Sequence, residues 1–366
     1  MSVSPIPAPE ISIAGRKVGY NHPTYFIADI AANHDGDLDR AIKLIRLAAE
    51  AGAEAAKFQN FRAPKIVSDY GFKSLGGQQS HQAEWRKSVF DVYQDASIPF
   101  EWTPILKKAC DENNIHYFSS PYDYEAIDML DKYVPAYKAG SGLMSWPEAL
   151  VRMASLGKPV LIATGAADIS DVVRVMRLVS KVNHQIVLLQ CNTNYTASDS
   201  NYDHLNLNVL KTYRAMYPNV VLGLSDHTHS PAPVTGAVAL GARVIERHFT
   251  DDNDREGPDH KFAMNPENWA DMVLQVRTLE RALGSTDKFV TGSEQETYVL
   301  QRRCLRAARD IKAGEKITTD MVEPLRPAVR GAIMPWEMGH IIGKTALVDM
   351  PYGMDLRWEN IGSSEN

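Results

Sequence analysis

The sequence predicts a (β/α)8 barrel, the TIM-barrel architecture, followed by a small β-rich domain. The first 285 residues contain eight short apolar runs, each followed by a segment of helical character, and this is the number of units in such a barrel. No G-x-G-x-x-G motif opens the first helical segment, which weakens the alternative of a dinucleotide-binding open sheet. After Gly284 the pattern changes to short apolar stretches separated by turns, which indicates a second domain.

The barrel units are predicted from apolar runs that end in polar clusters. In the first unit, a strand follows a polar lead-in, Asp37 is a cap signal for the helix, and Gly52 ends that helix. The expected strands are 25–31, 55–59, 116–119, 136–139, 159–163, 186–189, 220–222 and 244–245. The expected helices are 38–51, 82–95, 104–113, 124–133, 147–155, 169–181, 207–217, 231–240 and 266–283. The long Gly- and Ser-rich loop 61–81 is a candidate active-site lid.

We therefore expect three parts: a barrel domain over 1–285, a polar linker over 286–298, and a separate β-rich domain over 299–366. In the last part, Gly314, Gly343 and Gly353 stand where hairpins would turn.

The composition excludes several classes of protein. With 39 basic and 45 acidic residues the net charge is −6, whereas a nucleic-acid partner would require a clustered basic excess. No apolar run is long enough to span a bilayer, and the N-terminal segment lacks the apolar core of a signal peptide. The three cysteines are far apart, which is typical of a reducing compartment, so we expect a cytoplasmic protein with no membrane partner.

Two histidines end the last two expected strands and form a candidate metal pair. His227 follows the seventh strand and His248 the eighth, with Asp259 and His260 close behind. Strand ends of this kind carry the ligand site of a parallel barrel. Two imidazoles with open positions suit a divalent ion, which we expect to be Mn²⁺, although Mg²⁺, Co²⁺, Fe²⁺ and Zn²⁺ suit the same donors. The alternative is that both rings are satisfied by backbone partners.

Two lysines in apolar strands indicate an anion site. Lys57 and Lys138 need anionic partners, because a buried unpaired ammonium is costly. With the hydroxyls of Ser120, Ser141 and Ser225, they could hold a phosphate and a carboxylate. Two alternatives stay open, namely a structural ion pair of Lys57 with Asp29 or Glu246, and a Schiff-base lysine.

At these residues the sequence resembles the sialic acid (nonulosonate) synthase family, whose members are N-acetylneuraminate synthase-like enzymes. The matching stretches of the barrel are ADIAANHDGDL, AGAEAAKFQNFRA, YFSSPYD, YKAGSG, GKPVLIATG, GLSDHT, VIERHFT and GPDHKFA. In the second domain RDIKAGEKIT, LRP and IIGK resemble the antifreeze-like (SAF) domain that ends these enzymes. The resemblance covers nearly the whole chain.

The resemblance implies a metal-dependent condensation of phosphoenolpyruvate with an N-acetylated hexose, which gives a nonulosonic acid and releases phosphate by C–O cleavage. It assigns the metal to His227 and His248. It also implies a domain-swapped homodimer, in which an arginine from the SAF domain of the partner chain reaches the N-acyl group of the sugar. Arg326 is the best match to this arginine, and Arg330 is a weaker match. The substrate-binding residues would be Lys57, Gln59, Ser120, Lys138, Ser141, Thr193, Tyr195, Ser225, Asp259 and Arg326. The catalytic residues would be Asp29, Lys57, Glu246, His227 and His248.

Four positions depart from the family pattern, and they leave the acceptor sugar open. Asp29 and Leu143 stand where the family has glutamate, Asn60 where it has threonine, and Thr196 where it has proline. The acceptor could be N-acetylmannosamine, or a bacterial diamino or deoxy sugar that gives a legionaminate- or pseudaminate-type product. The alternatives are a catalytically impaired sugar-binding homologue and a related 3-deoxy sugar acid synthase.

Overall fold

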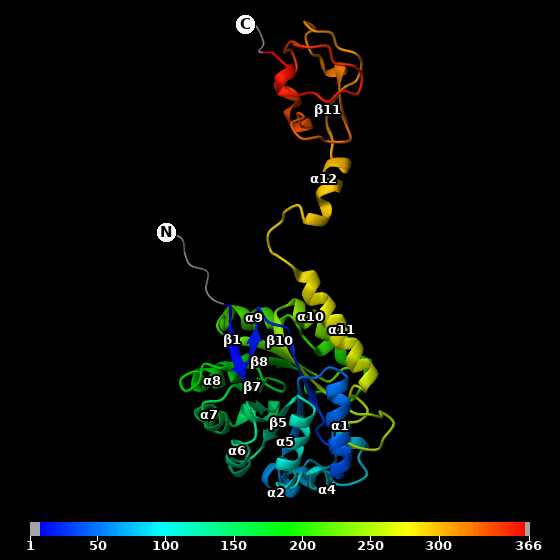
Figure 1. Ribbon diagram of the computed structural model, residues 1–366. Coiled ribbons are helices and arrows are strands. Elements are labelled where there is room, and N and C mark those ends of the chain that lie inside the picture. The colour runs from blue at the N-terminus through cyan, green and yellow to red at the C-terminus, as the bar shows by residue number, and fades with distance from the viewer. Residues whose placement is uncertain (1–7, 363–366) are drawn as a thin grey trace. The chain divides into compact units, whose positions relative to one another are not determined.

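The computed structural model describes residues 8–362, and its main element is an eight-stranded sheet that curls into a nearly closed barrel (Figure 1). The strand order is β5-β4-β3-β10-β9-β8-β7-β6, every ladder is parallel, and the end strands β5 and β6 lie side by side. The strands are β3 (Tyr25–Asp29), β4 (Ala55–Asn60), β5 (His116–Pro121), β6 (Tyr137–Ala139), β7 (Val160–Ala163), β8 (Ile186–Cys191), β9 (Val221–Asp226) and β10 (Ala242–His248). The predicted barrel fold is confirmed.

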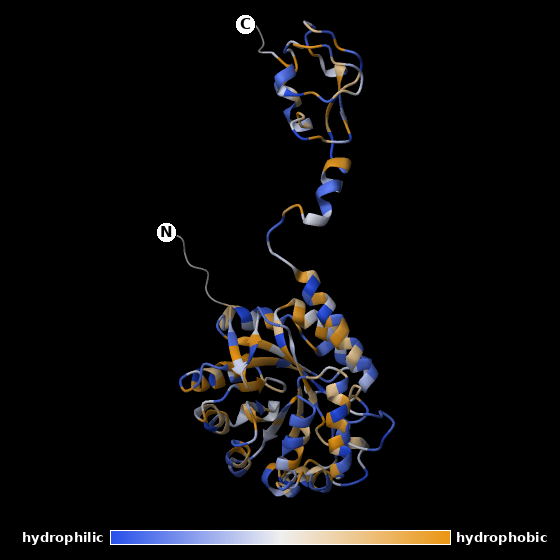
Figure 2. Cartoon of the chain, in the orientation of Figure 1, coloured by the Kyte–Doolittle hydropathy of each residue, from blue (hydrophilic) through white to orange (hydrophobic). Residues whose placement is uncertain are grey.

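Helices surround the sheet, and both apolar and polar residues are visible along most of them in Figure 2. In α8 the buried side chains are Val172, Val175, Met176 and Val179, which is the spacing of one helical face. Helix α1 begins where the Asp37 carboxylate accepts the backbone N–H groups of Asp39 and Arg40. The helices of the barrel wall are α1 (Leu38–Glu50), α5 (Trp102–Glu112), α6 (Tyr124–Leu130), α7 (Pro147–Ser155), α8 (Ile169–Val179), α9 (Val209–Met216), α10 (Ala232–Ala239) and α11 (Pro266–Leu283).

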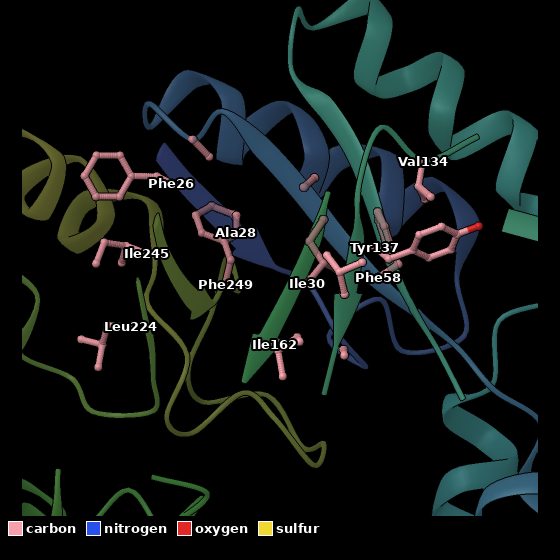
Figure 3. Packing of buried hydrophobic residues seen from close by; sticks show 14 of the residues in the cluster. Phe26, Ala28, Ile30, Phe58, Val134, Tyr137, Ile162, Leu224, Ile245 and Phe249 are labelled. Atoms are coloured by element: carbon pink, nitrogen blue, oxygen red, sulfur yellow. The ribbon is translucent and has the colours of Figure 1, made fainter. Parts of the chain in front are cut away.

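The larger part of the core lies between the sheet and these helices. Phe26, Leu224, Ile245 and Phe249 belong to it, and all four are buried (Figure 3). A second apolar cluster joins side chains from inside the barrel, such as Phe118, to an N-terminal hairpin. These two layers hold the strand ends in fixed positions, which a site built across several strands requires.

That N-terminal hairpin is absent from the sequence prediction, which treats the segment as a polar lead-in. Strands β1 (Glu10–Ile13) and β2 (Arg16–Gly19) pair in antiparallel register. Ile11, Ile13 and Val18 are buried, and they pack against the apolar side chains inside the barrel. Each strand has only four residues, and buried and exposed residues alternate in β1 but not in β2, which is too little to identify the strands from sequence.

The segment between β4 and α5 also differs from the prediction. The expected loop 61–81 contains short helices, and the single helix expected over 82–95 is wrong. Ser88 accepts the backbone N–H of Asp91 and starts a new helix there, which divides the expected one. The elements are α2 (Ala63–Ile66), α3 (Asp69–Ser74), the 3₁₀ helix Ser80–Glu84, and α4 (Val89–Ala96). Further 3₁₀ turns follow β6 at Ser141–Ser145 and β8 at Asp199–His204.

The second compact unit, residues 285–366, has its own apolar core. Its two-stranded sheet pairs β11 (Cys304–Ala307) with β12 (Val322–Leu325), and the remainder is mostly turns and isolated bridges. Helix α12 (Gln295–Gln301) lies across the predicted end of the linker. The other elements are the 3₁₀ turns Gly292–Glu294, Thr319–Met321, Pro335–His340 and Trp358–Asn360. Among the described residues of both units, no helix has the length and apolar content that crossing a bilayer requires.

Candidate active site

The carboxyl ends of the barrel strands surround a cavity of about 450 Å³. Most of the site residues predicted from sequence line it: Asp29, Lys57, Gln59, Lys138, Ser141, Thr193, Tyr195, Ser225, His227, Glu246 and His248. Ser120 is buried and lies within 3.4 Å of Lys57 Nζ, and Asp259 Oδ2 lies 3.9 Å from His248 Nδ1. Arg326 belongs to the second unit and is exposed there. A larger cavity of about 900 Å³ shares Tyr195 with the first.

Two lysines and two carboxylates form a buried ion network inside the smaller cavity. Lys57 Nζ lies 2.6 Å from Asp29 Oδ2 and 3.9 Å from Glu246 Oε2, and Lys138 Nζ lies 3.2 Å from Glu246 Oε1. The ion pair of Lys57 with Asp29, one of the alternatives that the sequence left open, is therefore present. Ser225 Oγ donates to Glu246 Oε1 at 3.1 Å, and Lys57 Nζ donates to Ser120 Oγ at 3.4 Å.

Strand register creates this network. Asp29 of β3 is paired with Lys57 of β4, and Ser225 of β9 is paired with Glu246 of β10. Burial alone would raise the pKa of Glu246, but Lys138 and Lys57 outweigh that effect and lower it to about 2. For Asp29 burial is the larger effect, and its pKa is raised despite the neighbouring ammonium of Lys57. The two carboxylates therefore differ in their affinity for a proton.

The predicted metal pair lies at the same rim, with ring centroids of His227 and His248 5.3 Å apart. His227 Nδ1 lies 2.8 Å from the carbonyl oxygen of Asn192, so that this nitrogen carries the proton and Nε2 keeps the lone pair. His248 Nδ1 is buried and has no hydrogen-bond partner within residues 8–362, and burial lowers the pKa of this ring to about 3. His248 is therefore neutral at neutral pH, as a metal ligand must be.

These donors fit an open metal site rather than a closed one. Among the described residues, no group of three or more His, Cys, Asp or Glu side chains is arranged as metal ligands. Two imidazoles leave coordination positions for water or substrate oxygens, which is the character of a catalytic site. Tyr195 and Phe262 pack against the rings, with centroids 4.4 Å from His227 and 4.8 Å from His248 respectively.

Several side chains that line the cavity were missed by the sequence analysis. Tyr122 follows β5 directly, so the rule that strand ends carry the site could have found it. Lys65 and Tyr93 come from the helical segments after β4, whose structure was predicted incorrectly. Trp146 also lines the cavity. Cys191, whose place at the end of a strand suggested that it could approach the site, lines it too.

His260 does not take part in the predicted metal group. Its Nε2 lies 2.9 Å from Asp35 Oδ1 and its Nδ1 lies 2.8 Å from Thr250 Oγ1. Asp35 also accepts from Arg255 at 2.7 Å. Asp35 thus connects the loop after β3 with the loop after β10. The loop after β10 also carries Asp259, whose Oδ2 accepts the backbone N–H of Ala32 at 3.1 Å.

The replacement Asp35→Asn is expected to loosen the loop over 251–262. Hydrogen bonds to charged groups are worth about 1.5–3 kcal/mol each, so backbone amides of that loop should exchange hydrogen roughly tenfold faster. Hydrogen–deuterium exchange read by mass spectrometry measures this, with Asp39→Asn in α1 as the control. Unchanged exchange in the Asp35 variant would show that the loop is ordered by other contacts.

The pH dependence of folding is expected to reflect His34, which is buried after β3. Burial lowers the pKa of this ring from 6.5 to about 4. Between these values the unfolded chain binds a proton that the native chain does not, so stability is complete above pH 6.5 and falls as the pH falls towards 4. From pH 7 to pH 5 the original protein should lose roughly 2 kcal/mol more than His34→Asn. Urea unfolding at both values measures it, and equal losses would contradict the assignment.

The chain is similar to known proteins over most of its length. Residues 44–288 match the model of the NeuB family, and residues 302–361 match that of the SAF domain. The spore coat polysaccharide biosynthesis protein SpsE of Bacillus subtilis is 32% identical over 95% of this chain and 96% of that protein. Its crystal structure aligns with a TM-score of 0.63, covering 97% of this chain and 100% of that one.

Two further relatives carry the names of synthases. Human N-acetylneuraminate-9-phosphate synthase is 31% identical over 91% of each chain. The N,N'-diacetyllegionaminic acid synthase of Campylobacter jejuni is 32% identical over 88% of this chain and 96% of that one. Since the family model matches more than half of the sequence and these relatives match nearly all of it, the chain belongs to the NeuB family of nonulosonic acid synthases and ends in a SAF domain.

Proposed function

We propose that this chain condenses phosphoenolpyruvate with an N-acetylated hexose to give a nonulosonic acid and phosphate. The observation that carries the proposal is one cavity in which buried lysines face a pair of imidazoles, at least one of them neutral. The names of the relatives support the same class of product. The acceptor would be N-acetylmannosamine or a related bacterial amino or deoxy sugar.

The lysines and hydroxyls would hold the anionic substrate. Lys57 and Lys138 would supply side-chain amino groups, and Ser141 and Ser225 would add hydroxyl groups at the same rim. Such donors bind phosphate and carboxylate oxygens through charge-assisted hydrogen bonds. By fixing phosphoenolpyruvate, they would hold its C3 carbon in position to attack the aldehyde of the open-chain sugar.

The bonds and protons of this reaction balance within the cavity. A bond forms between C3 of phosphoenolpyruvate and the aldehyde carbon, and the aldehyde oxygen takes up a proton. The electron pair of the C2–C3 double bond makes this new bond, and water adds at C2 and loses a proton, which leaves a hydroxyl group there. The C2–O bond to phosphate then breaks with its electron pair leaving on phosphate, while that hydroxyl group loses its proton to become the C2 carbonyl and the phosphate takes up a proton. Asp29, whose pKa is raised, is the carboxyl group suited to exchange a proton, whereas Glu246 stays ionised and holds the lysines in place.

His227 and His248 would hold a divalent ion, for which Mn²⁺ is our expectation. When bound, such an ion would supply Lewis-acid polarisation of the aldehyde oxygen. Asn192 orients His227 through its carbonyl group, and Asp29 Oδ2 lies 3.5 Å from His248 Nε2. Protein groups that contact the rings of metal-ligating histidines in this way fix the orientation of those rings.

The test measures phosphate release from phosphoenolpyruvate across a panel of acceptor sugars, with product masses read by mass spectrometry. We expect release only when an N-acetylated hexose and a divalent ion are both present. Release without an acceptor, or undiminished after chelation, would refute the proposal.

One observation favours a second candidate, a sugar-binding homologue that has lost activity. Leu143 lines the cavity where the family pattern has a glutamate, and its apolar side chain cannot transfer a proton. Calorimetric binding of a sugar without turnover for any acceptor in the panel would favour this candidate.

We further propose that Arg326 acts in the active site of a second copy of the chain, within a domain-swapped homodimer. Its exposure on the SAF domain supports this role. Mixing His248→Ala chains with Arg326→Ala chains tests it, because a dimer that exchanges SAF domains would regain part of the activity. No recovery after subunit exchange would contradict the proposal.

A further inference from the structure

Lys65 is the lysine of the cavity that has no carboxylate partner within the described part of the chain. It lies on α2, directly after the strand that carries Lys57, and it lines the same cavity of about 450 Å³. The two other lysines of this cavity are paired, Lys57 with Asp29 and Lys138 with Glu246. The nearby Arg62 is also neutralised, since it lies 3.0 Å from Asp123 and 2.7 Å from Glu125.

This pairing leaves the cavity with an excess of positive charge. Three lysines line it, but only two carboxylates, Asp29 and Glu246, do so. The four buried groups of the network compensate one another, so the excess charge is that of Lys65. A cation of this kind attracts an anion most strongly inside a concave site, where part of the solvent is excluded.

The carboxylates of the cavity are already engaged, so among the described residues none is left for Lys65. Asp29 pairs with Lys57 and Glu246 pairs with Lys138. Ile66, next to Lys65 in the chain, and the lining residues Leu143 and Trp146 have no acceptor atoms on their side chains. An incoming anion therefore meets no internal competitor at Lys65, in contrast to Lys57 and Lys138.

We propose that Lys65 is a further binding residue for phosphoenolpyruvate, whose phosphate or carboxylate it contacts from the α2 side of the cavity. The proposal rests on the proposed function, in which phosphoenolpyruvate is the anionic substrate and the acceptor sugar is neutral. Because the side chain is exposed and carries four methylene groups, it remains hydrated until the anion arrives. Lys65 then contributes to binding rather than to the bond-forming step.

The experiment compares the full-length protein with Lys65→Met, which keeps the length of the side chain and removes its charge. A lost charge-assisted hydrogen bond corresponds to roughly a tenfold weaker binding. We expect KM for phosphoenolpyruvate to rise about tenfold, with kcat and KM for the acceptor within about twofold. Calorimetric Kd for phosphoenolpyruvate without acceptor should rise equally, and Lys65→Arg should restore much of it. Lys181→Met, which removes an exposed lysine elsewhere, is the matched control.

The outcomes separate this inference from the proposed function. If the unaltered protein neither binds phosphoenolpyruvate nor turns it over, the proposed function fails. If it does both, and Lys65→Met leaves KM and Kd for phosphoenolpyruvate unchanged, the inference about Lys65 alone is overturned. A change confined to KM for the acceptor overturns it too.

Discussion

The variants His227→Ala and His248→Ala are each expected to lose turnover by about a thousandfold or more. The reason is that Lewis-acid polarisation lowers the activation free energy of the proposed reaction by several kcal/mol. The two rings are the imidazole donors at the rim of the cavity. His248 Nδ1 has no hydrogen-bond partner in the described part of the chain, so replacing His248 removes a candidate metal ligand without breaking a hydrogen bond of that atom there.

Equilibrium metal binding provides the readout that does not depend on activity. Titration calorimetry with Mn²⁺ should show tight binding to the original protein and none to either variant. His184→Ala, an exposed histidine outside the cavity, is the control and should match the original protein in both measurements. Should both variants keep Mn²⁺ binding and turnover, the ion would have to bind elsewhere, and the assignment of the metal pair would be withdrawn.

The variant Glu246→Gln is expected to lose about 3–5 kcal/mol of folding stability, which is the cost of leaving buried charges without their partner. Glu246 lies between Lys138 at 3.2 Å and Lys57 at 3.9 Å, and all three side chains are buried. The glutamine keeps the shape of the side chain but leaves Lys57 paired with Asp29 alone and Lys138 without its carboxylate partner. Urea unfolding at pH 7 measures the loss, and Glu148→Gln on the exposed face of α7 is the control.

Two further measurements identify charge as the cause. The double variant Glu246→Gln with Lys138→Met removes the uncompensated ammonium group and should recover part of the lost stability. The folded-state pKa of Glu246, about 2, lies below its ordinary value of 4.5. Its contribution is therefore complete above pH 4.5 and is lost as the pH falls towards 2. The difference between the original protein and Glu246→Gln should shrink over that interval, and a constant difference would indicate packing instead.

The repeated units of the barrel were predictable because their signals are local. Apolar runs, cap residues such as Asp37 and closing glycines such as Gly52 each act within a few residues. The segment 61–96 was not predictable in the same way. Its helices are short and start at local caps such as Ser68 and Ser88, whose signals are as frequent in turns as in helices. Lys65 was missed because its helix, α2, has only four residues and no side-chain cap.

The sequence also underestimated the lengths of two strands, which continue beyond their apolar runs. The seventh and eighth strands continue to Asp226 and His248, because parallel neighbours pair their polar ends as well. An apolar run marks where a strand is buried, whereas pairing decides where it ends.

The sequence by itself determined the fold class and the residues that stand at strand ends, since both follow from periodicity along the chain. The tertiary structure alone decided which of these residues meet. The register of β3 with β4 pairs Lys57 with Asp29, and β10 brings Glu246 between two lysines. Lys65 is left without a carboxylate partner among residues 8–362. Charges cancel through distances in space, and distances between separate strands are fixed only when the barrel closes.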